Sequence, residues 1–185
     1  MEIERKFLLS SFDEDRFLAA LSAISHKRKE ISQAYISFAP VLRLRKSDEH
    51  YILTYKGAGL LLREEHNIEM TQEDFERLMT KTEGRILEKT RYVLRLGNFT
   101  GIWDEQTLPL QEDLCLEVDI FKGEDKGLVL AEIEFADEEQ ALGFSPPTCL
   151  GREVTADSRY QNASLAKAYP LDEPEARFSS VIAGQ

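Results

Sequence analysis

Charged side chains of one sign recur two positions apart in several segments of this chain. These like-charged pairs are Arg43 and Arg45, Glu117 and Asp119, and Glu132 and Glu134. In an extended strand, residues i and i+2 lie on the same face, and like charges placed there repel unless a ligand or counter-charge offsets them. Arginine suits forked contact with phosphate oxygens, and paired carboxylates suit a hard divalent cation. The pattern therefore indicates a site for a phosphate-rich anion and a metal ion.

A solvated outer face is the competing interpretation of any one of these strands, since antiparallel sheets often have one polar face. The set as a whole favours a site, because arginine is paired with arginine and carboxylate with carboxylate. A closed barrel would accommodate them: the charged faces would point into a tunnel, and the apolar faces would point outward under the helices. Acidic and basic walls would then offset each other across the tunnel.

The elements that must position these residues are mostly strands. Alternation and turn residues predict strands at 2–9, 31–38, 41–47, 50–56, 61–69, 86–96, 100–105, 113–121 and 128–135. Short connections between them imply an antiparallel, mainly β fold. Helices are predicted after a cap at Ser10 or Ser11, after Thr71 and, briefly, after Asp137, and a last one runs to about Ala168 from Thr155 or Asp157.

The chain of 185 residues fits one domain, which we place at 1–170, with a flexible tail at 171–185. Its net charge of -11 argues against a general nucleic-acid partner. No apolar run is long enough to span a membrane, and the charged N-terminus does not resemble a secretory signal. Cys115 and Cys149 are far apart and form no CxxC motif. We therefore expect free thiols and a cytoplasmic protein.

The opening Glu2-Ile3-Glu4-Arg5-Lys6 resembles the ExExK signature of the CYTH superfamily, the triphosphate tunnel metalloenzymes. The resemblance continues in order along residues 1–168 and is strongest to the small bacterial members with a single domain. The further matching segments are Leu42-Arg43-Leu44-Arg45, Leu53-Thr54-Tyr55-Lys56, Arg63-Glu64-Glu65, Glu88-Lys89-Thr90-Arg91-Tyr92, Glu117-Val118-Asp119, Glu132-Ile133-Glu134 and Asp157-Ser158-Arg159-Tyr160-Gln161-Asn162.

The resemblance implies an eight-stranded antiparallel closed β-barrel with short helices packed outside and a polyphosphate substrate inside. It implies that Mg²⁺ or Mn²⁺ is bound by Glu2, Glu4 and Glu134. It assigns phosphate contacts to Lys6, Arg43, Arg45, Lys56, Lys89 and Arg91, with Arg159 reaching in from the last helix. It has Glu132, with Glu65 and Asp119, position or deprotonate the attacking water.

One segment departs from the family pattern. Small members carry ExE where this chain has Glu65-His66-Asn67, so one negative charge is lost. The expected reaction is hydrolysis of inorganic tripolyphosphate to pyrophosphate and phosphate. An adenylyl cyclase, a thiamine- or nucleoside-triphosphatase, and a non-catalytic polyphosphate- or nucleotide-binding module remain alternatives. A homodimer is compatible with the family.

Overall fold

The fold is one curved antiparallel sheet, seen in a computed structural model that describes residues 3–57, 65–103 and 114–167. Nine strands are hydrogen-bonded in the order β5-β4-β3-β2-β6-β7-β8-β1-β9. Their bounds are β1 Ile3–Leu8, β2 His26–Phe38, β3 Val41–Ser47, β4 His50–Lys56, β5 Glu65–Glu69, β6 Glu83–Arg95, β7 Cys115–Phe121, β8 Val129–Phe135 and β9 Arg152–Glu153. The prediction of a mainly antiparallel β fold is confirmed.

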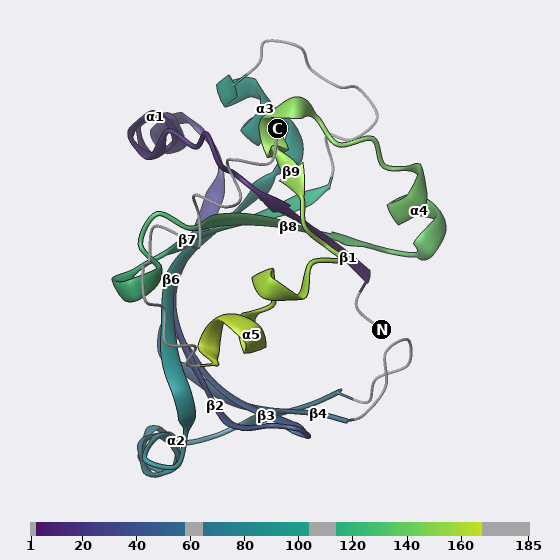
Figure 1. Ribbon diagram of the computed structural model, residues 1–185. Coiled ribbons are helices and arrows are strands. Elements are labelled where there is room, and N and C mark those ends of the chain that lie inside the picture. The colour runs from purple at the N-terminus through teal and green to yellow at the C-terminus, as the bar shows by residue number, and fades with distance from the viewer. Residues whose placement is uncertain (1–2, 58–64, 104–113, 168–185) are drawn as a thin grey trace.

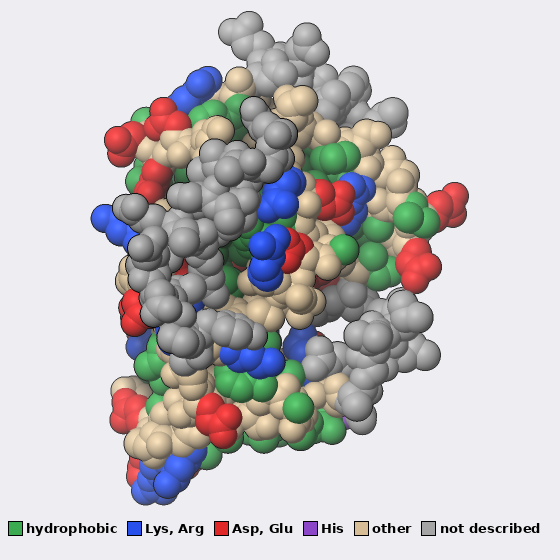
Figure 2. Space-filling view, in the orientation of Figure 1, with side chains coloured by type: hydrophobic (Ala, Val, Ile, Leu, Met, Phe, Trp, Pro, Cys, Tyr) green, Lys and Arg blue, Asp and Glu red, His purple; other side chains and the backbone are tan. Residues whose placement is uncertain are grey.

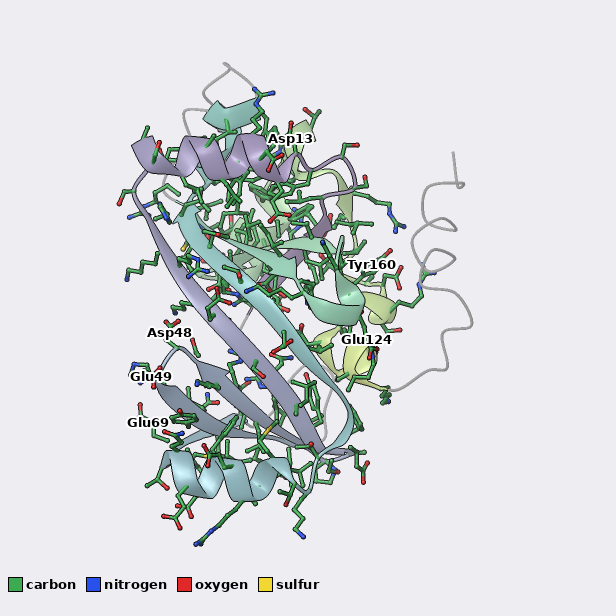
Figure 3. The ribbon with its side chains drawn as sticks, turned by 90° about the vertical axis from the view of Figure 1, so that its left-hand side faces the viewer. Asp13, Asp48, Glu49, Glu69, Glu124 and Tyr160 are labelled. Atoms are coloured by element: carbon green, nitrogen blue, oxygen red, sulfur yellow. The ribbon has the colours of Figure 1, made fainter. Side chains whose placement is uncertain are left out.

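The helices are short and join the strands at their ends. They are α1 Glu14–Ala20, α2 Gln72–Met79, α3 Leu96–Trp103, α4 Glu138–Gly143 and α5 Asn162–Ala166, with single 3₁₀ turns η1 Leu21–Ala23, η2 Gly123–Asp125, η3 Thr148–Leu150 and η4 Ser158–Tyr160. The paired strands β2 and β6 run side by side from α1 at one end of the molecule to α2 at the other (Figure 3). No helix in the described ranges is long and apolar enough to cross a membrane.

The expected closed barrel is wrong, because the described strands form an open, C-shaped sheet (Figure 1). Its two edges are β5 and β9, and within the described residues neither edge strand pairs with the other. The edge of β1 that closure would need is taken by β9, where Phe7 pairs with Glu153 and Leu8 with Arg152. The strand count is nine instead of eight for the same reason.

The expectation that all helices pack outside is also wrong, because α5 lies inside the curve of the sheet (Figure 1). Gly84 of β6 makes this possible: a Cβ there would lie 2.2 Å from the carbonyl oxygen of Ala166. Arg85 adds a hydrogen bond of 2.6 Å from its Nη2 to the carbonyl oxygen of Leu165. The helix is therefore seated directly on the backbone of β6.

Two apolar clusters follow from the alternation along the strands. The larger one packs the convex side of β1, β6, β7 and β8 under α1, α3 and α4, and includes Phe17, Phe99 and Val118. The smaller one packs the concave side under η4 and α5, and includes Leu130 and Leu165. Because apolar clusters fill both sides of this half of the sheet, charged residues of β1, β6, β7 and β8 that face α5 are buried.

The elements predicted from local signals are confirmed only in part. Thr71 and Asp137 cap α2 and α4, as predicted: each side chain accepts a hydrogen bond from the backbone N–H three residues on. Helix α1 is instead capped by Asp13. The strand predicted at 100–105 is wrong, since 96–103 form α3, and the single last helix is divided into η4 and α5. The tail at 171–185 lies outside the described residues.

Candidate active site

A cavity of about 590 Å³ occupies the concave side of the sheet. It is lined by strands from both halves of the C and by the segment that carries η4 and α5. Figure 2 looks onto an opening in this face, with Lys and Arg side chains beside it. The charged residues that line it are Glu4, Lys6, Arg43, Arg45, Lys56, Glu65, Arg91, Glu117, Glu132, Glu134 and Asp157. The cavity therefore brings together nine of the thirteen residues that the sequence predicted for the site.

One wall of the cavity is acidic and is built by β1, β7 and β8. Antiparallel pairing places Glu4 of β1 directly opposite Glu134 of β8, and Glu117 of β7 directly opposite Glu132. Glu4 and Glu134 are exposed within the cavity mouth. Like charges directly opposite each other destabilise a sheet unless positive charge offsets them. Arg91 contacts both Glu117 and Glu132, and Lys6 Nζ lies 3.8 Å from Glu4 Oε1.

The facing wall is basic and is built by β3 and β4. Arg43 donates from Nη2 to the hydroxyl oxygen of Thr54 at 3.1 Å, and Lys56 pairs with Glu65 at 2.6 Å. The Arg45 side chain forms no hydrogen bond or ion pair with any described residue, and the Nε atoms of Arg43 and Arg45 are buried without a hydrogen-bond partner. Burial, followed by the neighbouring charges of Arg43 and Arg91, lowers the pKa of Arg45 to about 10. Two arginines thus present guanidinium groups that a bound anion would neutralise.

The floor between the walls is a network of ion pairs around Glu132. Its Oε1 pairs with Lys6 Nζ at 2.8 Å, and its Oε2 accepts a hydrogen bond from Arg91 Nη2 at 2.7 Å. Arg91 also pairs with Glu117. Burial would raise the pKa of Glu132, but Lys6, Arg91 and Lys89 outweigh it and hold that pKa far below its usual range. Glu132 is therefore a firmly ionised carboxylate.

Asp119 and Lys89 lie beneath this floor and not on the cavity surface. The side chain of Asp119 is 1% exposed and that of Lys89 is 0% exposed, and the two are paired at 2.5 Å. Lys89 Nζ also contacts Asn162 Oδ1 of α5 at 3.4 Å. Burial would raise the pKa of Asp119, but Lys89 and Arg91 lower it overall. Asp119 is placed as the counter-ion of the two basic residues.

Two other predicted residues are not part of the described cavity. Arg159 is 66% exposed and is paired with Asp157 at 2.6 Å, and its side chain is not among those that line the cavity. Glu2 lies outside the described residues. The structure also adds lining residues that the sequence analysis did not select, namely Tyr35, Thr54, Gln161 and Asn162. Thr54 shares a strand face with Lys56, which was the available signal for it. Gln161 and Asn162 lie in the segment 157–162 that resembles the family, but only Arg159 of that segment was assigned a role.

Comparison with known proteins agrees with this geometry. A family model described as the CYTH domain matches residues 1–143. The chain is 36% identical over 169 residues to an inorganic triphosphatase of Nitrosomonas europaea, covering 91% of this chain and 99% of that protein. It is 35% identical over 170 residues to an inorganic triphosphatase of Acetivibrio thermocellus, covering 90% and 93%.

A solved structure is also similar to this chain. A crystal structure of an inorganic triphosphatase matches with a TM-score of 0.63 and 34% sequence identity, over 92% of this chain and 97% of that one. The family model spans more than half of the chain, and the two relatives match it over nearly their whole length. The chain therefore belongs to the CYTH domain family.

Proposed function

We propose that this protein is an inorganic triphosphatase that cleaves tripolyphosphate to pyrophosphate and phosphate with the help of Mg²⁺ or Mn²⁺. The proposal takes its reaction from the two relatives that carry this name, both aligned along most of the chain. The cavity supports it independently, since it offers cationic and anionic walls facing each other across a space suited to a small, highly charged ligand.

Arg45 is the observation that carries this proposal. A guanidinium group stays ionised at neutral pH, and burying it without a directly paired carboxylate is unfavourable, although the more distant charges of Asp119 and Glu132 offset part of the cost. Its neighbour Arg43 adds a second positive charge on the same strand face, and both line the cavity. A triphosphate supplies several negative oxygens in a row, so one ligand would neutralise both residues and Lys56 beside them.

The residues of the acidic wall fit a divalent cation. Carboxylate oxygens are the ligands that Mg²⁺ prefers, and it is often held by one or two carboxylates together with substrate phosphates. Glu4 and Glu134 could supply these two, and the family resemblance assigns Glu2 to the same role. Within the described ranges no three acidic, cysteine or histidine side chains form a group that could hold a metal ion by themselves, so phosphate oxygens would have to complete the site. A bound cation would neutralise charge that develops on the phosphates during cleavage.

The chain's own side chains would mainly position the reactants, as is typical of phosphoryl transfer. The arginines and Lys6 would hold the phosphate oxygens. A water oxygen would form a bond to a terminal phosphorus as the bridging P–O bond breaks, pyrophosphate would leave with the bridging oxygen, and one proton of the water would be released to solvent. Glu132 would hold Lys6 and Arg91 in place through its two carboxylate oxygens. Asp119 would not touch the substrate and would act indirectly, by holding Arg91 and Lys89 in position.

The test is a substrate panel with purified protein. Tripolyphosphate, ATP and thiamine triphosphate are each incubated with Mg²⁺, Mn²⁺ or excess EDTA, and orthophosphate and cyclic AMP are quantified. The proposal predicts phosphate release chiefly from tripolyphosphate, abolished by EDTA. Faster release from ATP or thiamine triphosphate would reassign the substrate, and cyclic AMP would reassign the reaction. Tight tripolyphosphate binding without turnover would indicate a binding module.

A further inference from the structure

A chain of hydrogen bonds crosses three neighbouring strands of the basic wall and passes through Asn67. Arg43 Nη2 donates to Thr54 Oγ1 at 3.1 Å, and Thr54 Oγ1 donates to Asn67 Oδ1 at 2.7 Å. Asn67 Nδ2 donates to Glu65 Oε1 at 3.3 Å, and the other oxygen of Glu65 pairs with Lys56. Strand register puts Arg43, Thr54 and Asn67 opposite one another in a line. The connection is therefore built into the sheet.

The direction of these hydrogen bonds suits an amide at position 67. Thr54 has one hydroxyl proton, and since it accepts from Arg43 it gives that proton to residue 67. Residue 67 must therefore accept on one side and donate on the other, toward a carboxylate. An asparagine does both. An aspartate could accept from Thr54 but would face Glu65 with a second negative charge.

The neutral amide also determines the charge of the wall. Arg43, Arg45 and Lys56 are cationic and Glu65 is anionic, so these four carry a net charge of about +2. A carboxylate at 67 would reduce this to about +1. Thr54 is fully buried, whereas Asn67 is exposed on the edge strand β5. A substitution at 67 would therefore change the potential in the cavity without opening a void in the core.

We propose that Asn67 is a positioning residue for the anionic substrate. Its amide holds the Arg43 guanidinium through Thr54, holds the Glu65 carboxylate against Lys56, and keeps the basic wall at the higher positive charge. This inference rests on the proposed function for the identity of the anion, tripolyphosphate. It adds that a residue with no charge of its own sets how strongly the basic wall binds that anion.

The test measures tripolyphosphate binding by isothermal titration calorimetry in excess EDTA, so that no cation contributes. N67D is expected to weaken binding by about tenfold, because it places a like charge beside the ligand site. Asn98 is exposed on α3, on the convex side of the sheet, so N98D is the matched control for the same change of charge. Equal binding by N67D and wild type, or an equal loss in N98D, would overturn the inference.

A second pair of variants separates positioning from charge. T54V removes the hydroxyl at nearly constant volume and is expected to weaken binding and raise KM by about three- to tenfold, while kcat stays within about twofold. T54S, which keeps the hydroxyl, should have the binding affinity and the KM of the wild type. A T54S variant as impaired as T54V would contradict the hydrogen-bond chain. Wild type that binds tripolyphosphate without cleaving it would defeat the proposed function alone, whereas wild type that does not bind it would defeat both.

Discussion

Arg91 and Asp119 are joined by two parallel hydrogen bonds beneath the floor of the cavity, Nε to Oδ1 and Nη2 to Oδ2, each 2.6 Å long. Their strands place them directly opposite each other. The same guanidinium continues upward to Glu132 and Glu117, which line the cavity. Arg91 therefore connects the fully buried carboxylate of Asp119 to the residues that line the cavity, where a substrate would bind.

Asp119→Asn should be among the most damaging single substitutions in this chain. It leaves Lys89 buried without its carboxylate partner and removes one of the three carboxylates that pair with Arg91. Breaking a buried ion pair from one side costs about 3–5 kcal/mol of unfolding free energy. Urea denaturation at pH 7 measures it. Asp15→Asn, on the exposed first turn of α1, is the matched control and should cost less than about 1 kcal/mol. Equal stability of the two variants would contradict the role given to Asp119.

Arg45→Met should separate stability from binding. It removes a charge that has no partner among the described residues, so the free energy of unfolding without ligand should rise by about 1 kcal/mol. KM for tripolyphosphate should rise by at least about tenfold, because a charge-assisted contact is lost. Arg28→Met, at a 55% exposed side chain, should change neither value by much. A variant that is both less stable and equally active would count against an anion site at Arg45.

The stability of the protein should fall in acid because of Glu132. Its pKa is lower in the folded than in the unfolded chain, so its contribution is fully present above the unfolded pKa and is lost as pH falls through the folded one. The free energy of unfolding should therefore decrease from about pH 5 downward, by up to about 1.4 kcal/mol per pH unit for this group.

Glu132→Gln tests that assignment. The variant should be less stable at pH 7, since Lys6 and Arg91 each lose one charged partner, but its stability should depend less steeply on pH below 5. Urea denaturation curves collected between pH 3 and pH 7 give both slopes. Parallel slopes for the variant and the wild type would show that other carboxylates cause the acid sensitivity.

Gly84→Ala should displace α5 from the concave face. The new Cβ would lie 2.2 Å from the Ala166 carbonyl oxygen, and the residue has a φ of +73° that favours glycine. We expect a loss of more than about 1 kcal/mol and faster amide hydrogen exchange in α5. Gly101→Ala is the control, because Gly101 has open space around its Cβ position within α3. Unchanged exchange in α5 would mean that Gly84 does not seat the helix.

Short-range patterns in the sequence predicted the charged faces of the strands but not how deeply each residue is buried. Because Arg43 and Arg45 are two positions apart in a predicted strand, the sequence placed them on the same face, and in the structure both line the cavity. The same spacing grouped Lys89 with Arg91, yet Lys89 is covered by α5. The alternation along a strand predicts which face a residue lies on. The burial of Lys89 depends instead on α5, a helix some 70 residues further along the chain.

Closure of the sheet could not be predicted for a related reason. A barrel forms only if two edge strands meet, which depends on long-range contacts instead of local alternation. The two residues of β9 occupy the free edge of β1, and such a short strand leaves no periodic signal. The error at 100–105 has a local cause, since a short apolar run does not distinguish a strand from a buried helix.

The most direct test of the proposed reaction is a ³¹P NMR time course of tripolyphosphate with the wild-type protein. In Mg²⁺ or Mn²⁺ the terminal and central phosphate signals should decline together while orthophosphate and pyrophosphate appear in equal amounts, and excess EDTA should stop the change. Tripolyphosphate that persists with either cation, or cleavage that continues unchanged in EDTA, would contradict the assignment of this cavity as a cation-dependent triphosphatase site.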